Sequence, residues 1–173
     1  MVKAKEEEST VEETADNFKT KELEGNGVIK SNVLWSMGVG LIPFPIVDIL
    51  GTSAVQLRML DQLTKLYGIE FSKNWGKSAI GSLVGGLGSN GLARVGVSAS
   101  KMLPFFGTVV GVVASPLASG ASTYAIGKIF LQHFASGGTF LDFNPEKVRE
   151  HFAHLFEEGK LVASNMKGEL KKA

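Results

Sequence analysis

Gly76-Lys77-Ser78 is the first of a few short motifs whose residue types could carry chemistry, because it matches the end of a phosphate-binding loop. The first glycine of such a loop would stand five residues before Gly76, and that position is Phe71. A phenylalanine there blocks the backbone turn that points N–H groups at phosphate, and no β-strand pattern precedes it. The motif therefore does not predict a nucleotide site.

A second glycine motif, residues 86–91 (GLGSNG), has the letters of a dinucleotide-binding loop. In that fold an acidic residue about 20 positions later binds the ribose. Here no acid occurs between Glu70 and Asp142, and glycine-rich chains produce this string by chance. We therefore expect no dinucleotide site.

The histidines are the remaining candidates for chemistry. His151 and His154 are three residues apart with acids nearby, so they could share a helix face and bind a metal. The Glu-x-x-His spacing of helical di-metal sites is missing, and charged faces of amphipathic helices often have this composition. His133 has no acid or base partner in its sequence neighbourhood. Since no nucleophile, base and oxyanion hole can be assembled, we predict a protein that is not an enzyme and has no cofactor or metal.

Composition narrows the class of protein. The 173 residues include 18 Lys and Arg and 17 Asp and Glu, a net charge of +1, and no cysteine. This balance argues against a general nucleic-acid binder, which needs a basic excess, and the lack of cysteine excludes disulfides and thiolate metal sites. Glycine accounts for 21 of the 173 residues, about 12% of the chain against a usual share of about 7%. A soluble helical bundle and a membrane-inserted helical module both fit.

Charge divides the chain into three predicted parts. The first 25 residues contain eight acids and four lysines with few large apolar residues, so we expect residues 1–27 to be a disordered acidic tail. Residues 28–137 are an apolar, glycine-rich body. Residues 138–173 are a loop followed by an amphipathic C-terminal helix.

Proline and glycine divide the body into about four helices, and we predict an all-α fold of glycine-rich apolar hairpins. The proline corner at 43–45 ends the first helix, and Gly68 ends the second. The third should break near 88–91. The expected ranges are 28–42, 46–67, 72–101 and 102–134.

The C-terminal amphipathic helix is predicted from a start signal and a periodic pattern. Asn144 is suited to cap a helix, Pro145 to its first position and Glu146 to its first turn. Apolar residues then recur at helical spacing up to Leu170, with Lys and Glu between them.

Residues 102–127 form a run of 26 residues without a charge, which is long enough to cross a bilayer. Shorter apolar runs in the body suit re-entrant or shallow insertion. Small residues recur at four-residue spacing, which lets helix backbones approach closely. We predict a helix–helix or subunit interface, and hence a homo-oligomer, at Gly81, Gly85, Gly107, Gly111 and Ser115. In a soluble bundle the same small residues would serve tight crossings.

A polar stripe interrupts the apolar body. Asp48, Thr52 and Gln56 follow one another at four-residue spacing, and a carboxylate among apolar neighbours is costly unless it is capped or paired. Asp48 could cap the start of its own helix. It could instead pair with Arg94 or Lys101 at the same end of the folded hairpins.

The opposite end of the hairpins is basic. It collects Tyr67, Phe71 and Trp75 in an arrangement typical of an interfacial aromatic belt, together with Lys30, Lys65, Lys73, Lys77 and Lys128. Because both tails lie on this side, the positive-inside rule predicts that both termini are cytoplasmic.

The order and spacing of several short motifs resemble the bacterial "domain of unknown function 697" family. The resemblance covers roughly residues 28–135 and rests on 43–48 (PFPIVD), 56–59 (QLRM), 66–68 (LYG), 103–107 (LPFFG), 125–127 (AIG) and Phe134. It implies a helical, often membrane-associated module, and members often follow small GTPase domains. No activity can be carried over to particular residues. This chain shows no GTPase domain of its own, so nucleotide hydrolysis would come from a partner.

Together these observations predict a non-enzymatic, membrane-associated helical module. It would bind membrane lipid, form a homo-oligomer, and act as a scaffold or as the partner of a small GTPase in trans, without binding nucleic acid. The alternative is a soluble helical domain that self-assembles or binds another protein.

Overall fold

The computed structural model describes residues 2–41, 45–94 and 116–170, and within them the backbone forms α-helices and no strand. Side chains are described for 15–41, 50–86 and 116–169. The helices are α1 (Val2–Val39), α2 (Pro45–Tyr67), α3 (Lys73–Arg94), α5 (Pro116–Ala135) and α6 (Arg149–Leu170). The predicted all-α class is confirmed.

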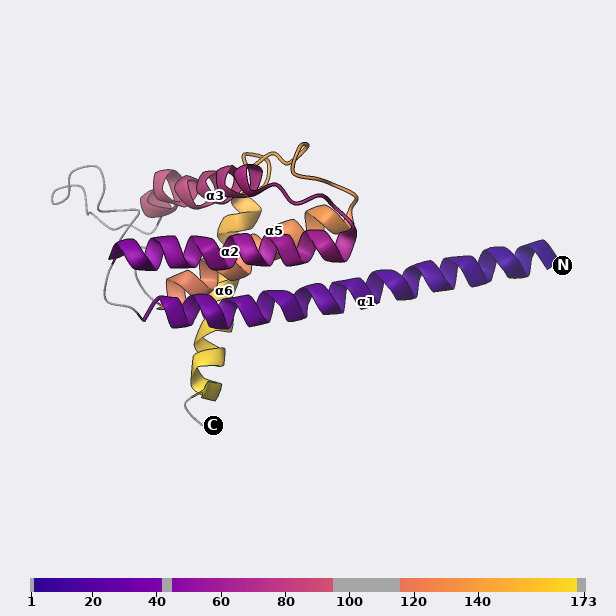
Figure 1. Ribbon diagram of the computed structural model, residues 1–173, viewed down its shortest axis with the longest axis horizontal. Helices are drawn as coiled ribbons and strands as arrows, with labels where there is room; N and C mark the ends of the chain where they lie inside the picture. The colour runs from indigo at the N-terminus through magenta and orange to yellow at the C-terminus, as the bar shows by residue number, and fades with distance from the viewer. Residues whose placement is uncertain (1, 42–44, 95–115, 171–173) are drawn as a thin grey trace.

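α1 differs from the expected disordered tail followed by a helix at 28–42. It is one continuous helix, and its N-terminal half projects away from the other helices (Figure 1). Glu, Lys and Ala, frequent in this half, are strong helix formers. The packed half of α1 also provides the nucleus, so the rest only has to propagate. The sequence prediction considered only acidity and low hydrophobicity, and its boundary at residue 27 falls inside the helix.

α2 has the predicted bounds within one residue. It begins at Pro45 and ends at Tyr67, and the next residue, Gly68, has a φ of +70°. The N–H of Gly68 donates to the carbonyl of Lys65, and the N–H of Ile69 donates to that of Thr64. These two bonds form a Schellman cap, which favours glycine because its φ is positive.

The bounds of α3 and α5 differ from the predicted ones. α3 continues to Arg94 without the break predicted near 88–91, since glycine weakens a helix by only about 1 kcal/mol per residue. Pro116, which lies inside the helix expected at 102–134, is the first residue of α5, where its fixed φ fits and its missing N–H leaves no bond unmade. Residues 95–115 lie outside the described part.

α6 follows a capped turn. The Asn144 side chain accepts hydrogen bonds from the N–H groups of Glu146 and Lys147, at 3.0 and 3.3 Å. Regular helix then begins at Arg149, five residues after the predicted cap. The helix is amphipathic as predicted: Phe152 is buried, whereas Glu157 and Lys160 form an exposed ion pair.

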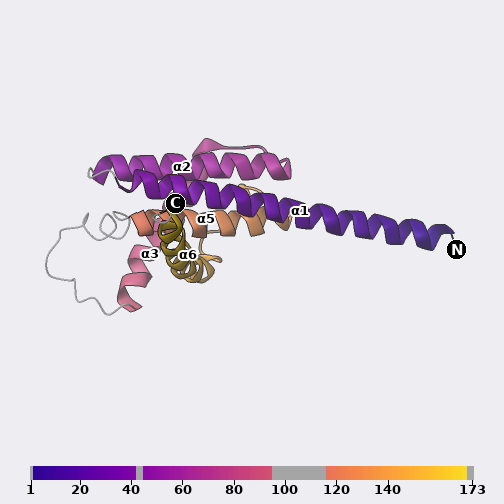
Figure 2. The ribbon, with the colours of Figure 1, turned by 90° about the horizontal axis from the view of Figure 1, so that it is seen from below.

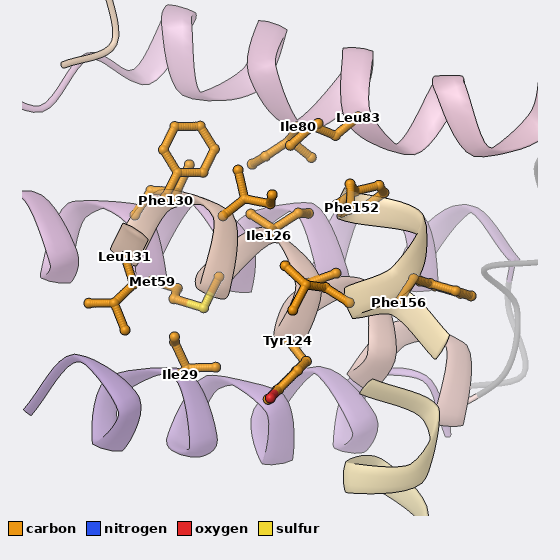
Figure 3. Packing of buried hydrophobic residues seen from close by; sticks show 14 of the residues in the cluster. Ile29, Met59, Ile80, Leu83, Tyr124, Ile126, Phe130, Leu131, Phe152 and Phe156 are labelled. Carbon is orange, nitrogen blue, oxygen red and sulfur yellow. The ribbon is translucent and has the colours of Figure 1, made fainter. Parts of the chain in front are cut away.

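α5 is the centre of the fold. α1 and α2 lie side by side, and α5 and α6 lie behind them in the view of Figure 1 (Figures 1 and 2). α5 contacts each of the other described helices. Figure 3 shows Ile126 and Phe130 of α5 among side chains from the neighbouring helices. Near its C-terminal end, Phe130 stacks on Phe143 with ring centroids 4.5 Å apart. Burial of this helix therefore organises the whole core.

Candidate functional site

Both nucleotide-loop motifs are helical. Gly76-Lys77-Ser78 lies in the first turns of α3, and the N–H of Gly76 donates to the carbonyl of Ser72 at 2.9 Å. Residues 86–91 are also within α3. A phosphate-binding loop needs several backbone N–H groups converging on one anion, and amides already bonded along a helix do not offer this geometry.

Two of the three histidines, His133 and His151, make structural hydrogen bonds, and the side chain of His154 is exposed. Nε2 of the exposed His151 lies 2.8 Å from Oε1 of Gln132 on α5. The ring of His133 donates from Nε2 to the carbonyl of Thr139 at 2.8 Å and lies 3.8 Å from the Asp142 carboxylate. His133 therefore has two partners in the structure, whereas its sequence neighbourhood had suggested that it has none. Among the side chains described, those of 15–41, 50–86 and 116–169, no three His, Asp or Glu are grouped so that they could hold a metal ion.

Asp142 closes the turn after α5. Its Oδ1 accepts from the hydroxyl and from the N–H of Thr139, each at 2.6 Å. These bonds, the hydroxyl one first, hold the pKa of Asp142 below its usual value. Gly137 adopts a φ of +84° in the same turn. The His133–Asp142 pair therefore belongs to a helix cap rather than to a catalytic arrangement.

The predicted polar stripe is partly described. Thr52 and Gln56 are both buried, and Gln56 donates from Nε2 to the hydroxyls of Ser122 and Thr123 at 3.1 and 3.3 Å. The side chains of Asp48 and Arg94 lie outside the described part. The stripe therefore faces α5 at Gln56, and its described partners are hydroxyls rather than a charge.

Further buried polar contacts join α1 to its neighbours. Asn32 donates to Oε1 of Gln62 at 2.7 Å, and the hydroxyl of Ser36 lies 3.2 Å from the carbonyl of Ser119. These partners were not predicted, because most of the residues of α5 belong to the uncharged run 102–127, whose pattern indicates only an apolar helix. The cluster of hydroxyl residues from 119 to 123 was the available signal.

The structure describes only two of the five residues of the predicted small-residue interface. Gly81 and Gly85 are exposed on α3, and a Cβ built on either would meet nothing within 4 Å. Gly107, Gly111 and Ser115 lie outside the described part. Within the described chain, Gly81 and Gly85 make no close helix crossing.

Other glycines do permit close crossings. A Cβ on Gly159 of α6 would lie 2.8 Å from the carbonyl oxygen and 2.9 Å from the Cα of Ala121 on α5. A Cβ on Gly120 would lie 2.7 Å from Met37, and one on Gly127 would lie 2.7 Å from Ile29. Tight packing through small residues therefore occurs inside the chain, at α5.

The exposed sides of α1 and α2 carry a group of large apolar residues with cations. Trp35 is 59% exposed, Leu41 70% and Leu50 66%. The guanidinium of Arg58 lies 6.0 Å from the centroid of the Trp35 ring, so the two helices meet there. We call this set the α1–α2 outer face; it consists of Lys30, Leu34, Trp35, Leu41, Leu50 and Arg58.

The aromatic belt expected at the basic end has a different arrangement. Tyr67 packs against Phe134 at 6.5 Å and Phe71 against Phe140 at 6.1 Å, so both rings belong to the edge of the core. Trp75 is 50% exposed. The outer face, with Trp35, was missed because α1 and α2 had to be paired before their exposed residues could be combined.

Known proteins similar to this chain agree with the motif resemblance. The family described as "Domain of unknown function (DUF697)" matches residues 7–160. The chain belongs to this family. Its match includes most of α1 and about half of α6, beyond the 28–135 that the motifs covered. "Magnetosome membrane protein 22" of Magnetospirillum gryphiswaldense is 36% identical over 148 residues, which are 85% of this chain and 76% of that protein. No solved structure matches.

The predicted membrane segment of this DUF697 chain, 102–127, is described only from Pro116 onward. Among the helices within 2–41, 45–94 and 116–170, none combines the length and apolar character needed to cross a bilayer.

A groove of about 390 Å³ lies between α1 and the C-terminal ends of α2 and α5. Phe18, Lys21 and Tyr67 line it, and the Lys21 ammonium is 5.7 Å from the centroid of the Tyr67 ring. Burial, and then the nearby charge of Glu22, raise the pKa of Tyr67. The lining residues do not include a nucleophile paired with a base.

Proposed function

We propose that this DUF697 chain is a non-enzymatic, membrane-associated helical module that acts as a scaffold. The observation that carries the proposal is its similarity, at 36% identity over 85% of the chain, to a protein named for a membrane. Similarity over nearly the whole helical body suggests that both proteins present related surfaces. Large exposed apolar residues grouped together are typical of interaction sites, and the α1–α2 outer face has this character.

Cell fractionation tests the membrane proposal. The full chain, expressed in a bacterium without a solubilising fusion, should sediment with membranes at low ionic strength. Its release by high salt or by alkaline carbonate then distinguishes surface association from insertion. Recovery of the chain entirely in the soluble fraction, at expression levels where it remains folded, would contradict membrane association and favour the soluble alternative.

We also propose a small GTPase as the partner in trans. The motif resemblance supports this partner, since related domains often follow GTPase domains. Because Lys77 lies within a regular helix, we infer that the partner, and not this chain, binds and hydrolyses the nucleotide. The purified chain should therefore show no binding of a fluorescent GTP analogue. Tight binding that Lys77→Ala abolishes would place a nucleotide site on this chain and remove the need for a partner GTPase.

Homo-oligomer formation is a further part of the proposal. Gly81 and Gly85 leave an open strip on α3 that a second copy could approach closely. Gly85→Leu should lower the mass measured by light scattering, whereas Gly168→Leu, at another open glycine on α6, should not. A parental mass for folded Gly85→Leu would exclude this strip as a subunit interface.

We place both termini on the cytoplasmic side of the membrane. The support is the basic end of the hairpins, where Lys128 bonds Asn26 at 3.0 Å and so lies beside α1. Protease added to intact spheroplasts should leave N- and C-terminal tags uncleaved, and cleavage of either tag would contradict the assignment.

A further inference from the structure

We infer that the α1–α2 outer face is the surface by which this protein binds an anionic lipid bilayer. The inference rests on the proposed membrane association and adds the surface and the lipid chemistry. It is carried by three features of the face: its extent over two packed helices, its charge and the side-by-side arrangement of these helices.

The face extends over two helices that contact each other at two points. Arg58 lies over Trp35, and Val39 packs against Gly51, so the antiparallel register brings the ends bearing Leu41 and Leu50 together. Single exposed apolar residues are ordinary on a soluble protein. Four large ones on one hairpin are unusual, because each exposes apolar area that burial would stabilise.

The charge of the face indicates that the surface it binds is anionic. Its charged residues, Lys30 and Arg58, are both cationic. The sequence has no acid between Glu24 and Asp48, or between Asp48 and Asp61. Asp61, one helical turn after Arg58, is paired with Lys65 at 2.7 Å, and the side chain of Asp48 lies outside the described part. The described cations of the face complement an anionic surface.

The other exposed large apolar residues on the body lack this charge pattern. Leu141 precedes Asp142, and Leu161 follows Glu157 and Glu158 by one helical turn. Trp75 lines a groove with Glu70. Acidic neighbours repel anionic lipid, so these positions suit protein contacts or solvent better than a bilayer.

The shape of the face suits an interface. α1 and α2 lie side by side, with α5 and α6 behind them and α3 alongside α2 (Figures 1 and 2), so residues of both α1 and α2 can contact a bilayer at once. Tryptophan prefers the level of the lipid headgroups. Lys and Arg can extend their charged ends to the phosphates while their stems pack on the apolar residues.

Tryptophan fluorescence tests the inference directly, because the chain contains two tryptophans. Trp75→Phe leaves Trp35 on the face as the reporter, and Trp35→Phe leaves Trp75 on α3 as the matched control. With vesicles of phosphatidylglycerol and phosphatidylcholine, emission of Trp35 should shift to the blue and be quenched by brominated lipid. Emission of Trp75 should change little at the same bound fraction.

Charge variants test the lipid chemistry. Arg58→Gln and Lys30→Gln should each lower partition onto these vesicles about fivefold, since one cation beside an anionic surface is worth about 1 kcal/mol. The control Lys147→Gln, at an exposed lysine before α6, should have little effect. Trp35→Glu should lower partition at least tenfold. Neutral phosphatidylcholine vesicles should show little dependence on Arg58 or Lys30.

The negative outcomes are separable from those of the membrane proposal. If the chain sediments with cell membranes and binds vesicles but Trp35 emission stays unchanged, the assigned face is wrong while membrane association stands. If the chain associates with no membrane, both fail. Blue-shifted Trp35 emission before vesicles are added would also overturn the inference. A dependence on protein concentration would then assign the face to a second copy, and independence would assign it to coverage by the same chain.

Discussion

α3 and α5 are both apolar, glycine-containing helices of similar length, but their surroundings differ sharply. From Ala118 to Gly127 every residue of α5 is buried, and its glycines face side chains of other helices. In the described part of α3, residues 73–86, the buried apolar residues are Ala79, Ile80 and Leu83, and Gly81 and Gly85 face open space. Small residues thus permit close helix packing, but such packing occurs only where another helix lies against them.

The largest expected effect is at the crossing of α5 and α6. Gly159→Ala would place a Cβ 2.8 Å from the carbonyl oxygen of Ala121, and backbone cannot move aside as a flexible side chain can. We expect the free energy of unfolding to fall by about 2–3 kcal/mol, as for other overpacked cores. Chemical denaturation monitored by circular dichroism measures this loss.

Gly168→Ala is the matched control, on the same helix with nothing within 4 Å of a Cβ. It should leave stability unchanged or raise it by up to about 1 kcal/mol, since alanine favours the helix. Equal stability of Gly159→Ala and Gly168→Ala would mean that the α5–α6 crossing is looser than described.

The next effect concerns the polar contact between α2 and α5. Gln56→Leu removes the bonds to Ser122 and Thr123 and leaves both buried hydroxyls without this donor. The free energy of unfolding should fall by about 1–2 kcal/mol. The control Gln132→Leu, on the exposed side of α5, should cost less, because water can replace its bond to His151. A neutral Gln56→Leu would show that apolar packing alone joins the two helices.

A gain in stability is expected on the open side of α3. In the dissociated monomer, Gly81→Ala and Gly85→Ala each add a methyl group where there is space, so helix propensity should dominate. Each should raise the free energy of unfolding by about 0.5–1 kcal/mol. A loss at either position would reveal a close neighbour on this face and make α3 resemble α5.

The smallest effect is expected at the turn that follows α5, and it depends on pH. The pKa of Asp142 is lower in the folded chain than its ordinary value, chiefly through the Thr139 hydroxyl. The stabilisation by this carboxylate is therefore present above the unfolded pKa, near about 4, and is lost as pH falls through the folded pKa. Asp142→Asn should slightly lower Tm at neutral pH, and the difference from the parent should shrink in acid.

NMR titration of the Asp142 carboxyl carbon provides an independent check. Thr139→Ala removes the hydroxyl donor, so the pKa of Asp142 should rise toward its usual value. An unchanged pKa would show that the turn does not hold the carboxylate as described.

Much of the fold could be predicted because its signals are local. The bounds of α2 follow from Pro45 and Gly68, which fix φ or require it to be positive, and the turn before α6 follows from Asn144. The apolar spacing of α6 likewise predicted its buried side. α1 was predicted poorly, because a helix that is nucleated elsewhere can extend through a segment with no core of its own.

The sequence by itself determined the helical class, both ends of α2, the start of α3, the end of α5 and the family, since these depend on backbone preferences and on ordered short motifs. Tertiary structure alone decided which apolar helix is central and which glycines lie at crossings. It also decided that Gln56 meets Ser122 and that Trp35 meets Arg58. Each of these depends on pairing helices distant in sequence, and residues whose local patterns are alike differ in burial only after that pairing.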